Sequence, residues 1–269
     1  MELYSDPSHF FLELIQNLDD ATYAQDVRAQ VTFKLSRRKL TVESNQAGFT
    51  EADVRAICDM GESSKALRSG VAKDMIGEKG IGSSLLSVIN SGFRSVFAVA
   101  DRVQVFSNGF NFEFDASKEL GKICPIILEE EGPSDKTLFV LFLSLDDAGY
   151  GKLERTLRSL QGEAMLFLNR LCLLTVHVNG IVTSYSRRIC EDEVRIESKW
   201  NRRTSAKKFV LVQSLWKPMP DHAKRPGKET KICIAFPFDS TGPVLDSNFI
   251  YAFLPMQKMP FKVDASVIR

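Results

Sequence analysis

Three polar side chains near the start of the chain have the types and spacing that phosphoryl chemistry requires. Glu13, Asn17 and Asp20 follow one another at offsets of four and three residues, which place them within about 60° of one another around a helix axis. A carboxylate can deprotonate a water molecule, and an amide oxygen can hold Mg²⁺. Phosphoryl transfer depends mainly on positioning and charge neutralisation, so a base and a metal ligand one turn apart suit it. The spacing alone, however, is more often the exposed face of an amphipathic helix.

A helix is predicted to carry these side chains. Asp6 and Pro7 supply an N-cap and a proline at the first helical position. Apolar residues then recur at helical spacing and define a face that would pack on a core: Phe10, Phe11, Leu14, Ile15 and Leu18. The three polar residues form a second stripe on the same helix.

Two glycine-containing segments could approach a nucleotide with their backbone. The first, Asn-Gln-Ala-Gly-Phe-Thr at 45–50, lies between a predicted strand and a predicted helix, and its Gly48 permits close approach. The second, Gly-Glu-Lys-Gly-Ile-Gly at 77–82, offers backbone N–H groups to phosphate oxygens at a helix entrance. It lacks the Gly-Lys-Ser/Thr ending of a Walker A loop. By itself it is typical of an ordinary flexible loop.

In this order and spacing, the segments resemble the ATP-binding motifs of the GHKL superfamily, which includes gyrases, large heat-shock chaperones, histidine kinases and MutL proteins. The string Glu-Leu-Ile-Gln-Asn-Leu-Asp-Asp-Ala at 13–21 resembles the N-box of that superfamily. The resemblance implies that Glu13 activates the attacking water, that Asn17 holds Mg²⁺ and that Asp20 supports the site.

The same resemblance implies the remaining nucleotide contacts. Residues 45–50 correspond to the segment that binds adenine, residues 77–82 correspond to the lid, and Thr137 matches a threonine near the adenine. The implied cofactors are ATP and Mg²⁺. The implied cofactor-binding residues are Asn17, Asp20, Ser44, Asn45, Gln46, Gly48, Ser64, Lys65, Gly77, Lys79, Gly80, Ile81, Gly82 and Thr137.

Further strings are similar to the sacsin and NO VEIN-like branch of the superfamily, and the resemblance is dense from Leu3 to about Leu145. These strings lie at 63–65, 76–82, 93–97 and 107–110. The chain departs from the pattern in two places. Ser44 stands where the superfamily has an adenine-reading aspartate, and Gln46 stands where the branch often has glutamate, so no carboxylate acceptor remains there. Residues Ser83–Gly92 also intervene where relatives run directly from the lid into Phe93.

Alternating apolar residues and turn signals predict three hairpins, with turns at 37–38, 108–109 and 179–180. We expect a buried strand over Thr137–Leu143, a helix from Thr50 to about Met60 and a long helix over Leu153–Leu171. Residues 1–185 are therefore predicted to be an α+β domain, a two-layer α/β sandwich of the GHKL (Bergerat) type with a mixed, mostly antiparallel sheet covered by helices. Residues 186–269, with strands near 208–215, 231–236 and 249–254, are predicted to be a β-rich extension leading to further domains.

The composition argues against several other classes. The net charge is only +1, so no overall charge draws the chain to nucleic acid or to a membrane. A basic run from Lys199 to Lys208 beside Trp200 is more typical of a solvated loop face than of a nucleic-acid patch. The five cysteines and three histidines are scattered without zinc-site spacing. The absence of a signal-peptide pattern and of long apolar runs predicts an intracellular protein of the cytoplasm or nucleus.

Two functions stay open on the sequence. The leading hypothesis is a Mg-dependent ATPase domain of a chaperone-like or regulatory protein, with lid closure coupled to the nucleotide. The alternative is a nucleotide-binding or scaffold module without turnover, which the altered 44–46 segment and residues 83–92 favour. A histidine kinase is disfavoured because no phosphoacceptor helix is visible. The expected partners are ATP, protein clients or further domains of the same protein, and a second copy in a homodimer.

Overall fold

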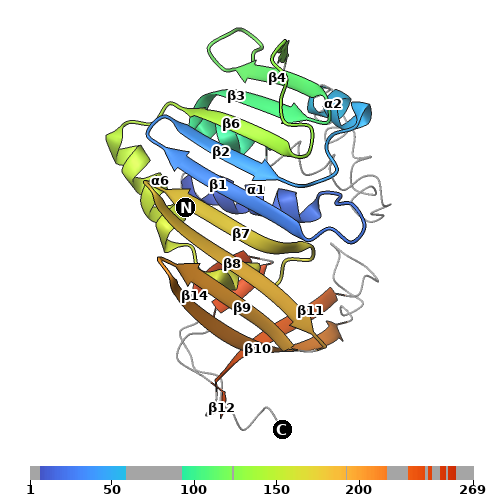
Figure 1. The fold of residues 1–269 in the computed structure, drawn as a ribbon, viewed down its shortest axis with the longest axis vertical. Helices are drawn as coiled ribbons and strands as arrows, with labels where there is room; N and C mark the ends of the chain where they lie inside the picture. Colours follow the sequence, from blue (N-terminus) through green and yellow to red (C-terminus); the bar gives the residue numbers. More distant parts are fainter. Residues whose placement is uncertain are drawn as a thin grey trace, which may run out of the picture. The chain divides into compact units, whose positions relative to one another are not determined.

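The computed structural model describes residues 7–58, 93–122, 124–191, 193–216, 230–239, 242–243, 249–252 and 254–258. The chain divides into two compact units (Figure 1). The first unit contains Met1–Gln161 and Leu168–Ser184, and the second contains Gly162–Phe167 and Tyr185–Arg269.

The first unit is built on a mixed, mostly antiparallel sheet, as the sequence predicts. Its strands follow the order β7-β1-β2-β6-β3-β4-β5. The β1–β7 pair is parallel, and the pairs β1–β2, β2–β6, β6–β3, β3–β4 and β4–β5 are antiparallel. The elements are α1 (Pro7–Asp20), β1 (Ala29–Ser36), β2 (Lys39–Ser44), α2 (Glu51–Cys58), the 3-10 helix η1 (Phe93–Ala98), β3 (Ala100–Ser107), β4 (Phe110–Asp115), β5 (Ile126–Ile127), β6 (Thr137–Leu143), α6 (Asp147–Ser159) and β7 (Leu171–Val178). Strand β8 (Ile181–Cys190) runs from this unit into the second.

The three predicted hairpins form at the predicted turns. Two of the turns are Asn-Gly pairs in which both residues have positive φ, with values of 52° and 81° at Asn108 and Gly109 and of 49° and 78° at Asn179 and Gly180. These angles suit a two-residue turn whose twist matches that of the flanking strands, and asparagine and glycine adopt them at low energy. The local sequence is therefore sufficient to determine these connections.

The predicted long helix over Leu153–Leu171 is wrong at both ends. Helix α6 begins earlier, because Asp146 caps it by accepting a hydrogen bond of 2.8 Å from the Gly149 amide. It ends at Ser159, and Leu171 already belongs to β7. The apolar residues after Ser159 are buried in the approach to that parallel strand instead of continuing one helical face.

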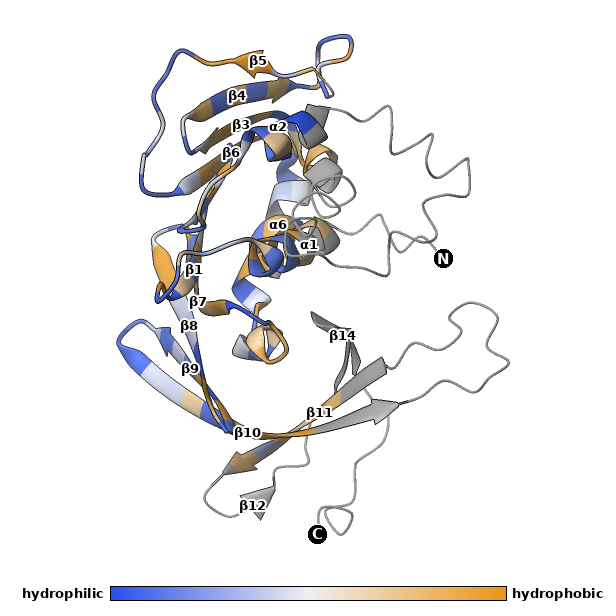
Figure 2. Cartoon of the chain, turned by 90° about the vertical axis from the view of Figure 1, so that its right-hand side faces the viewer, coloured by the Kyte–Doolittle hydropathy of each residue, from blue (hydrophilic) through white to orange (hydrophobic). Residues whose placement is uncertain are grey.

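The core lies between the sheet and two helices that cover one face of it. Figures 1 and 2 place α1 and α6 on the same side of the strands. The predicted apolar face of α1 is buried, and the ring of Phe11 packs edge-on against that of Phe33 with centroids 4.4 Å apart. The alternating Phe112 and Phe114 of β4 are also buried, as expected. Figure 2 shows the matching alternation of apolar and polar residues along the strands.

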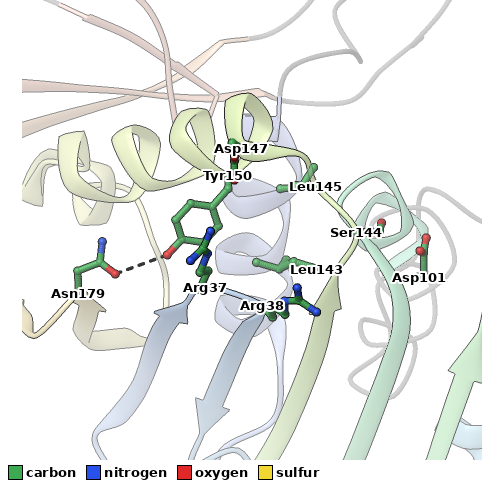
Figure 3. Close-up of a pocket in the computed structure, with 9 residues that line it drawn as sticks. All are labelled: Arg37, Arg38, Asp101, Leu143, Ser144, Leu145, Asp147, Tyr150 and Asn179. Carbon is green, nitrogen blue, oxygen red and sulfur yellow. Dashed lines mark hydrogen bonds between the residues drawn. The ribbon is translucent and has the colours of Figure 1, made fainter.

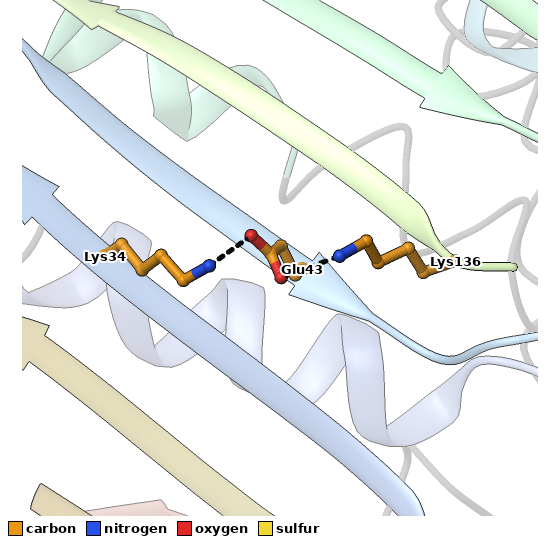
Figure 4. Close-up of polar contacts among 3 residues, drawn as sticks. All are labelled: Lys34, Glu43 and Lys136. Carbon is orange, nitrogen blue, oxygen red and sulfur yellow. Dashed lines mark hydrogen bonds and ion pairs between the residues drawn. The ribbon is translucent and has the colours of Figure 1, made fainter. Parts of the chain in front are cut away.

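The opposite face of the sheet carries paired charges. Glu43 lies between two lysines, with Lys34 Nζ 2.6 Å from its Oε1 and Lys136 Nζ 3.1 Å from its Oε2 (Figure 4). Burial acts to raise the pKa of Glu43, but the hydrogen bonds from the two lysines outweigh it and hold that pKa below its ordinary value. Neighbouring opposite charges on this face therefore neutralise one another.

The second unit is rich in β-strands. Strands β9, β10, β11 and β12 pair antiparallel in sequence order, and β13 pairs with β14. The elements are the 3-10 helix η2 (Gly162–Met165), β9 (Glu193–Trp200), β10 (Arg203–Trp216), β11 (Thr230–Asp239), β12 (Gly242–Pro243), β13 (Phe249–Ala252) and β14 (Leu254–Lys258). Among the helices that the structure describes, none is long and apolar enough to cross a membrane.

The basic run 199–208 is not a loop. It lies on the β9–β10 hairpin, whose turn is Asn201-Arg202. Two of its lysines are neutralised locally, because Lys207 pairs with Glu163 and Lys208 lies 3.3 Å from Glu193. The run is exposed to solvent, as expected, but it forms a hairpin and not the expected loop.

Candidate functional site

The predicted catalytic stripe lies on α1. Asn17 and Asp20 are partly buried on this helix. The backbone of Glu13 belongs to the same helix, while its side chain falls outside the described part. The predicted roles of Glu13, Asn17 and Asp20 therefore stay predictions. The contacts that fix the C-terminal end of α1 come from the neighbouring residues Asp19 and Tyr23.

Asp19 fixes the last turn of α1 against the start of β7. It is 3% exposed, and its carboxylate accepts three backbone hydrogen bonds, from the amides of Asn169 (2.6 Å), Arg170 (2.8 Å) and Leu171 (2.8 Å). A buried carboxylate that accepts several N–H groups is a strong and directional anchor. The sequence contained a signal for it, because Asp19 falls four residues after the core residue Ile15 and thus faces inward.

Tyr23 connects the end of α1 to the end of β2. Its hydroxyl donates a hydrogen bond of 2.7 Å to the Leu18 carbonyl and lies 3.2 Å from Ser44 Oγ. Burial raises the pKa of Tyr23 to about 12, although the hydrogen bond with Ser44 acts to lower it. The phenol therefore stays neutral at physiological pH. The sequence interpretation did not include Tyr23.

A chain of buried hydroxyl groups continues from Ser44 across the sheet end. Ser44 and Thr137 face each other in the β2–β6 register, and both are buried. Thr137 Oγ1 lies 2.6 Å from Ser107 Oγ, which also accepts a hydrogen bond of 2.9 Å from the Phe49 amide. The structure thus brings the predicted adenine-side residues Ser44 and Thr137 onto neighbouring strands, with Ser107 as an additional member.

The side chain of Asn45 is hydrogen-bonded to the backbone at the start of strand β1. Its Oδ1 accepts a hydrogen bond of 2.9 Å from the Gln30 amide, and its Nδ2 donates one of 2.9 Å to the Arg28 carbonyl. Gln46 is buried, with its backbone N–H 3.3 Å from Ser44 Oγ. The Asn45 amide therefore holds the chain after β2 against β1, which competes with its predicted contact to a base.

Gly48 has a structural reason to be glycine. Its φ is +87°, and a Cβ at this position would lie 2.6 Å from Asn108 Cβ. The following helix α2 begins as the sequence predicts. Asp53 Oδ2 accepts a 2.7 Å hydrogen bond from the Thr50 amide, and Thr50 Oγ1 lies 3.3 Å from the Asp53 amide. The segment from Ser44 to α2 is thus held in place at both ends.

The predicted lid residues lie outside the described residues. These are Gly77, Lys79, Gly80, Ile81 and Gly82. The predicted cofactor-binding residues Ser64 and Lys65 and the segment Ser83–Gly92 also lie outside the described residues. Within the described ranges, no group of three or more His, Cys, Asp or Glu side chains could hold a metal ion, and Cys124, Cys172, Cys190 and Cys233 form no disulfide.

Comparison with known proteins gives two groups of relatives. Protein NO VEIN of Arabidopsis thaliana is 30% identical over 293 aligned positions, which cover 97% of this chain and 10% of NO VEIN. The chaperone protein HtpG of Cronobacter sakazakii is 29% identical over 232 positions, covering 80% of this chain and 34% of the chaperone. HtpG of Nitrobacter hamburgensis is 29% identical over 188 positions, covering 60% of this chain and 29% of that chaperone. No protein-family profile matches the chain.

These similarities establish the relationship that the motifs predict. The chain is homologous to NO VEIN and to the HtpG chaperones, consistent with a GHKL-type, Hsp90-like ATPase domain related to the sacsin and NO VEIN-like branch. It spans about a tenth of the length of NO VEIN and about a third of the length of HtpG.

Proposed function

From the homology of this chain to NO VEIN and to the HtpG chaperones, we propose that it is a Mg-dependent ATP-binding and ATP-hydrolysing domain of an intracellular, chaperone-like or regulatory protein. Lid closure by residues 77–82 is coupled to the nucleotide, and the cycle acts on protein clients or on further domains. A second copy in a homodimer is an additional partner in this proposal.

The observation that carries the proposal is the junction between α1 and the end of the sheet. Tyr23 bonds to both the last turn of α1 and Ser44, and Ser44 faces Thr137 on the adjacent strand. The helix with the proposed catalytic residues is therefore joined to β2 through the Tyr23 hydroxyl, and β2 is paired with the strand that carries Thr137. Such a junction is suitable for a ligand that has a phosphate end and a base end.

The residues present are suitable for ATP and Mg²⁺. Asn17 is partly buried and would supply an amide oxygen to the metal, which when bound neutralises phosphate charge. Glu13 would take the proton of the attacking water, and Asp20 would support this end of the helix. At the other end, the buried hydroxyls of Ser44 and Thr137 would exchange part of their hydrogen bonding with Tyr23 and Ser107 for contacts with the base. Gln46 and Gly48 would complete the side of the site that contacts the base.

A specific observation favours the alternative, a nucleotide-binding module without turnover. The Asn45 side-chain amide is already hydrogen-bonded through its oxygen to Gln30 of β1 and through its nitrogen to Arg28, just before that strand. Together with the missing carboxylate at Ser44, this leaves the adenine contacts to neutral hydroxyl and amide groups. Weaker and less selective base recognition follows from that change.

Isothermal titration calorimetry with Mg-ATP and measurement of phosphate release separate the two functions. We expect Asn17→Ala to weaken Mg-ATP binding by about tenfold or more, because a metal ligand is lost. Glu13→Ala is expected to leave binding largely intact and to reduce phosphate release by about 100-fold, which is typical of the loss of a general base. Gln16→Ala, a neighbouring change on the same helix, is the control that alters neither quantity.

The outcomes are distinct. Binding without phosphate release, or phosphate release that Glu13→Ala does not reduce, contradicts hydrolysis by this site and supports the binding module. The absence of Mg-ATP binding by the unmodified chain contradicts both functions.

A further inference from the structure

A cavity lies at the end of β2 and β6 opposite to Ser44 and Thr137. It encloses about 600 Å³, which is within the usual range for small-molecule sites. It is formed where the β1–β2 turn, the end of β6, the start of α6 and the β7–β8 turn meet (Figure 3). Strand β2 leads from this cavity to Ser44, and β6 leads from Thr137 to it. No role in the proposed ATPase uses this cavity.

Four charged side chains line the cavity and do not neutralise one another. They are Arg37, Arg38, Asp101 and Asp147. Among the described residues, none of them forms an ion pair or a side-chain hydrogen bond. The Lys34–Glu43–Lys136 cluster on the same sheet shows the usual alternative, in which opposite charges within reach of one another pair (Figure 4).

The polar residues beside these charges add directional groups. Tyr150 Oη is 3.5 Å from Asn179 Oδ1, to which it donates, so the Asn179 amide nitrogen is left as a donor. Figure 3 shows the guanidinium of Arg37 on the Tyr150 side of the cavity and that of Arg38 extending toward the opposite side, where Asp101 lies. Guanidinium groups bind carboxylates with two parallel hydrogen bonds, and they stay charged at all physiological pH values.

The balance of the four charges restricts what can bind. Two guanidinium groups and two carboxylates give a lining with no net charge, so an anion gains from the arginines and loses to the aspartates. A cation gains from the aspartates and loses to the arginines. A ligand with both an anionic and a cationic group pairs with both sets at once.

We propose that this cavity is a second ligand site for small zwitterions of the amino-acid or short-peptide type. The carboxylate of the ligand pairs with one of the two arginines, Arg37 or Arg38, and its ammonium group pairs with one of the two aspartates, Asp101 or Asp147. Tyr150 and Asn179 hydrogen-bond the polar body of the ligand.

Three small probes of similar size separate the contributions of the two charges. Glycylglycine carries both charged groups, N-acetylglycine carries only the carboxylate, and glycinamide carries only the ammonium group. Titration of each into the ¹⁵N-labelled chain, followed by amide NMR shifts, gives both the affinity and the location. We expect glycylglycine to bind about tenfold more tightly than either singly charged probe, since each charge-assisted hydrogen bond is a significant part of a small ligand's affinity. The shifts should concentrate in residues 144–150 and 179.

Charge-removing variants test the residues. Arg37→Gln with Arg38→Gln, and separately Asp101→Asn with Asp147→Asn, should each weaken glycylglycine binding by about tenfold or more. Arg188→Gln, an exposed arginine of the second unit, is the matched control and should leave binding unchanged. The amide spectrum of the free variants reports whether the fold is retained. N-acetylglycine or glycinamide binding as tightly as glycylglycine overturns the proposal, as does the absence of shifts around this cavity.

Discussion

The two ends of β2 and β6 differ in burial and charge. At the Ser44–Thr137 end, neutral hydroxyl groups are buried, and that of Ser44 is hydrogen-bonded to Tyr23 while that of Thr137 is hydrogen-bonded to Ser107. At the Arg37–Leu143 end, exposed charges line an open cavity without pairing. The same strands supply both ends, so the difference comes from what covers them. The end of α1 and residues 45–49 close the first, whereas a two-residue turn leaves the second open.

This difference predicts a division of roles. A buried end whose polar groups satisfy one another resists substitution, because each lost partner leaves another group buried and unsatisfied. An exposed end whose charges are solvated tolerates substitution in the free protein and responds only when a ligand is present. Substitutions at the buried end should therefore lower the stability of the free protein, whereas substitutions at the exposed end should mainly weaken ligand binding.

The largest loss of stability is expected for Asp19→Asn. The asparagine has one acceptor oxygen where the carboxylate has two, and its amide group would face a backbone N–H at Asn169 or Arg170. We expect a loss of about 3 kcal/mol in the free energy of unfolding, measured by urea denaturation. Asp26→Asn, at an exposed position with a φ of 63°, is the control and should change stability little. A small effect at Asp19 would mean that the helix end is held by other contacts.

Gly48→Ala is expected to have the next largest effect. The new Cβ would lie 2.6 Å from Asn108 Cβ in a backbone with φ of +87°, so strain and overlap combine, with a loss of about 2 kcal/mol. Gly109→Ala is a matched control, because its φ of +81° is similar and nothing lies within 4 Å of the added methyl group. Thermal unfolding should rank Gly48→Ala well below Gly109→Ala. Equal losses would show that the backbone angle alone matters.

Alkaline titration compares one tyrosine from each end. The pKa of Tyr23 is raised to about 12 by burial, and burial also raises the pKa of Tyr150, with a smaller opposing effect from Arg37. A raised pKa favours the folded state below the unfolded value of about 10, and that stability is lost as the pH rises through the folded value. The tyrosinate absorbance should therefore lose its last-titrating component in Tyr23→Phe. Tyr150→Phe should remove an earlier component, and the reverse order would contradict the difference in burial.

The smallest effect on stability is expected for Arg37→Gln and Arg38→Gln. Both side chains are exposed in a turn, and substitutions at such sites usually change the free energy of unfolding by less than about 0.5 kcal/mol. Urea denaturation of the two single variants tests this directly. A loss comparable to that of Gly48→Ala would mean that the charged end is part of the folded framework instead of a ligand surface.

Much of the first unit could be predicted from local sequence. The Asn108-Gly109 and Asn179-Gly180 turns, the apolar face of α1 and the Thr50–Asp53 cap all depend on residues close in the chain, and all formed as expected. The end of α6 could not be predicted in this way. The apolar residues after Ser159 are compatible with either a helix or the approach to a buried parallel strand, and only pairing with β1 favours the strand.

The candidate site divides in the same manner. The sequence by itself determined the types and spacing of Glu13, Asn17 and Asp20 and the family resemblance, because these are properties of one short segment and of motif order. Only the tertiary structure decided that Tyr23 joins α1 to Ser44, that Asn45 is held by β1, and that Arg37, Arg38, Asp101 and Asp147 share a cavity. The physical reason is that hydrogen bonds and charges act through space, and strand pairing brings together groups that are far apart in the sequence.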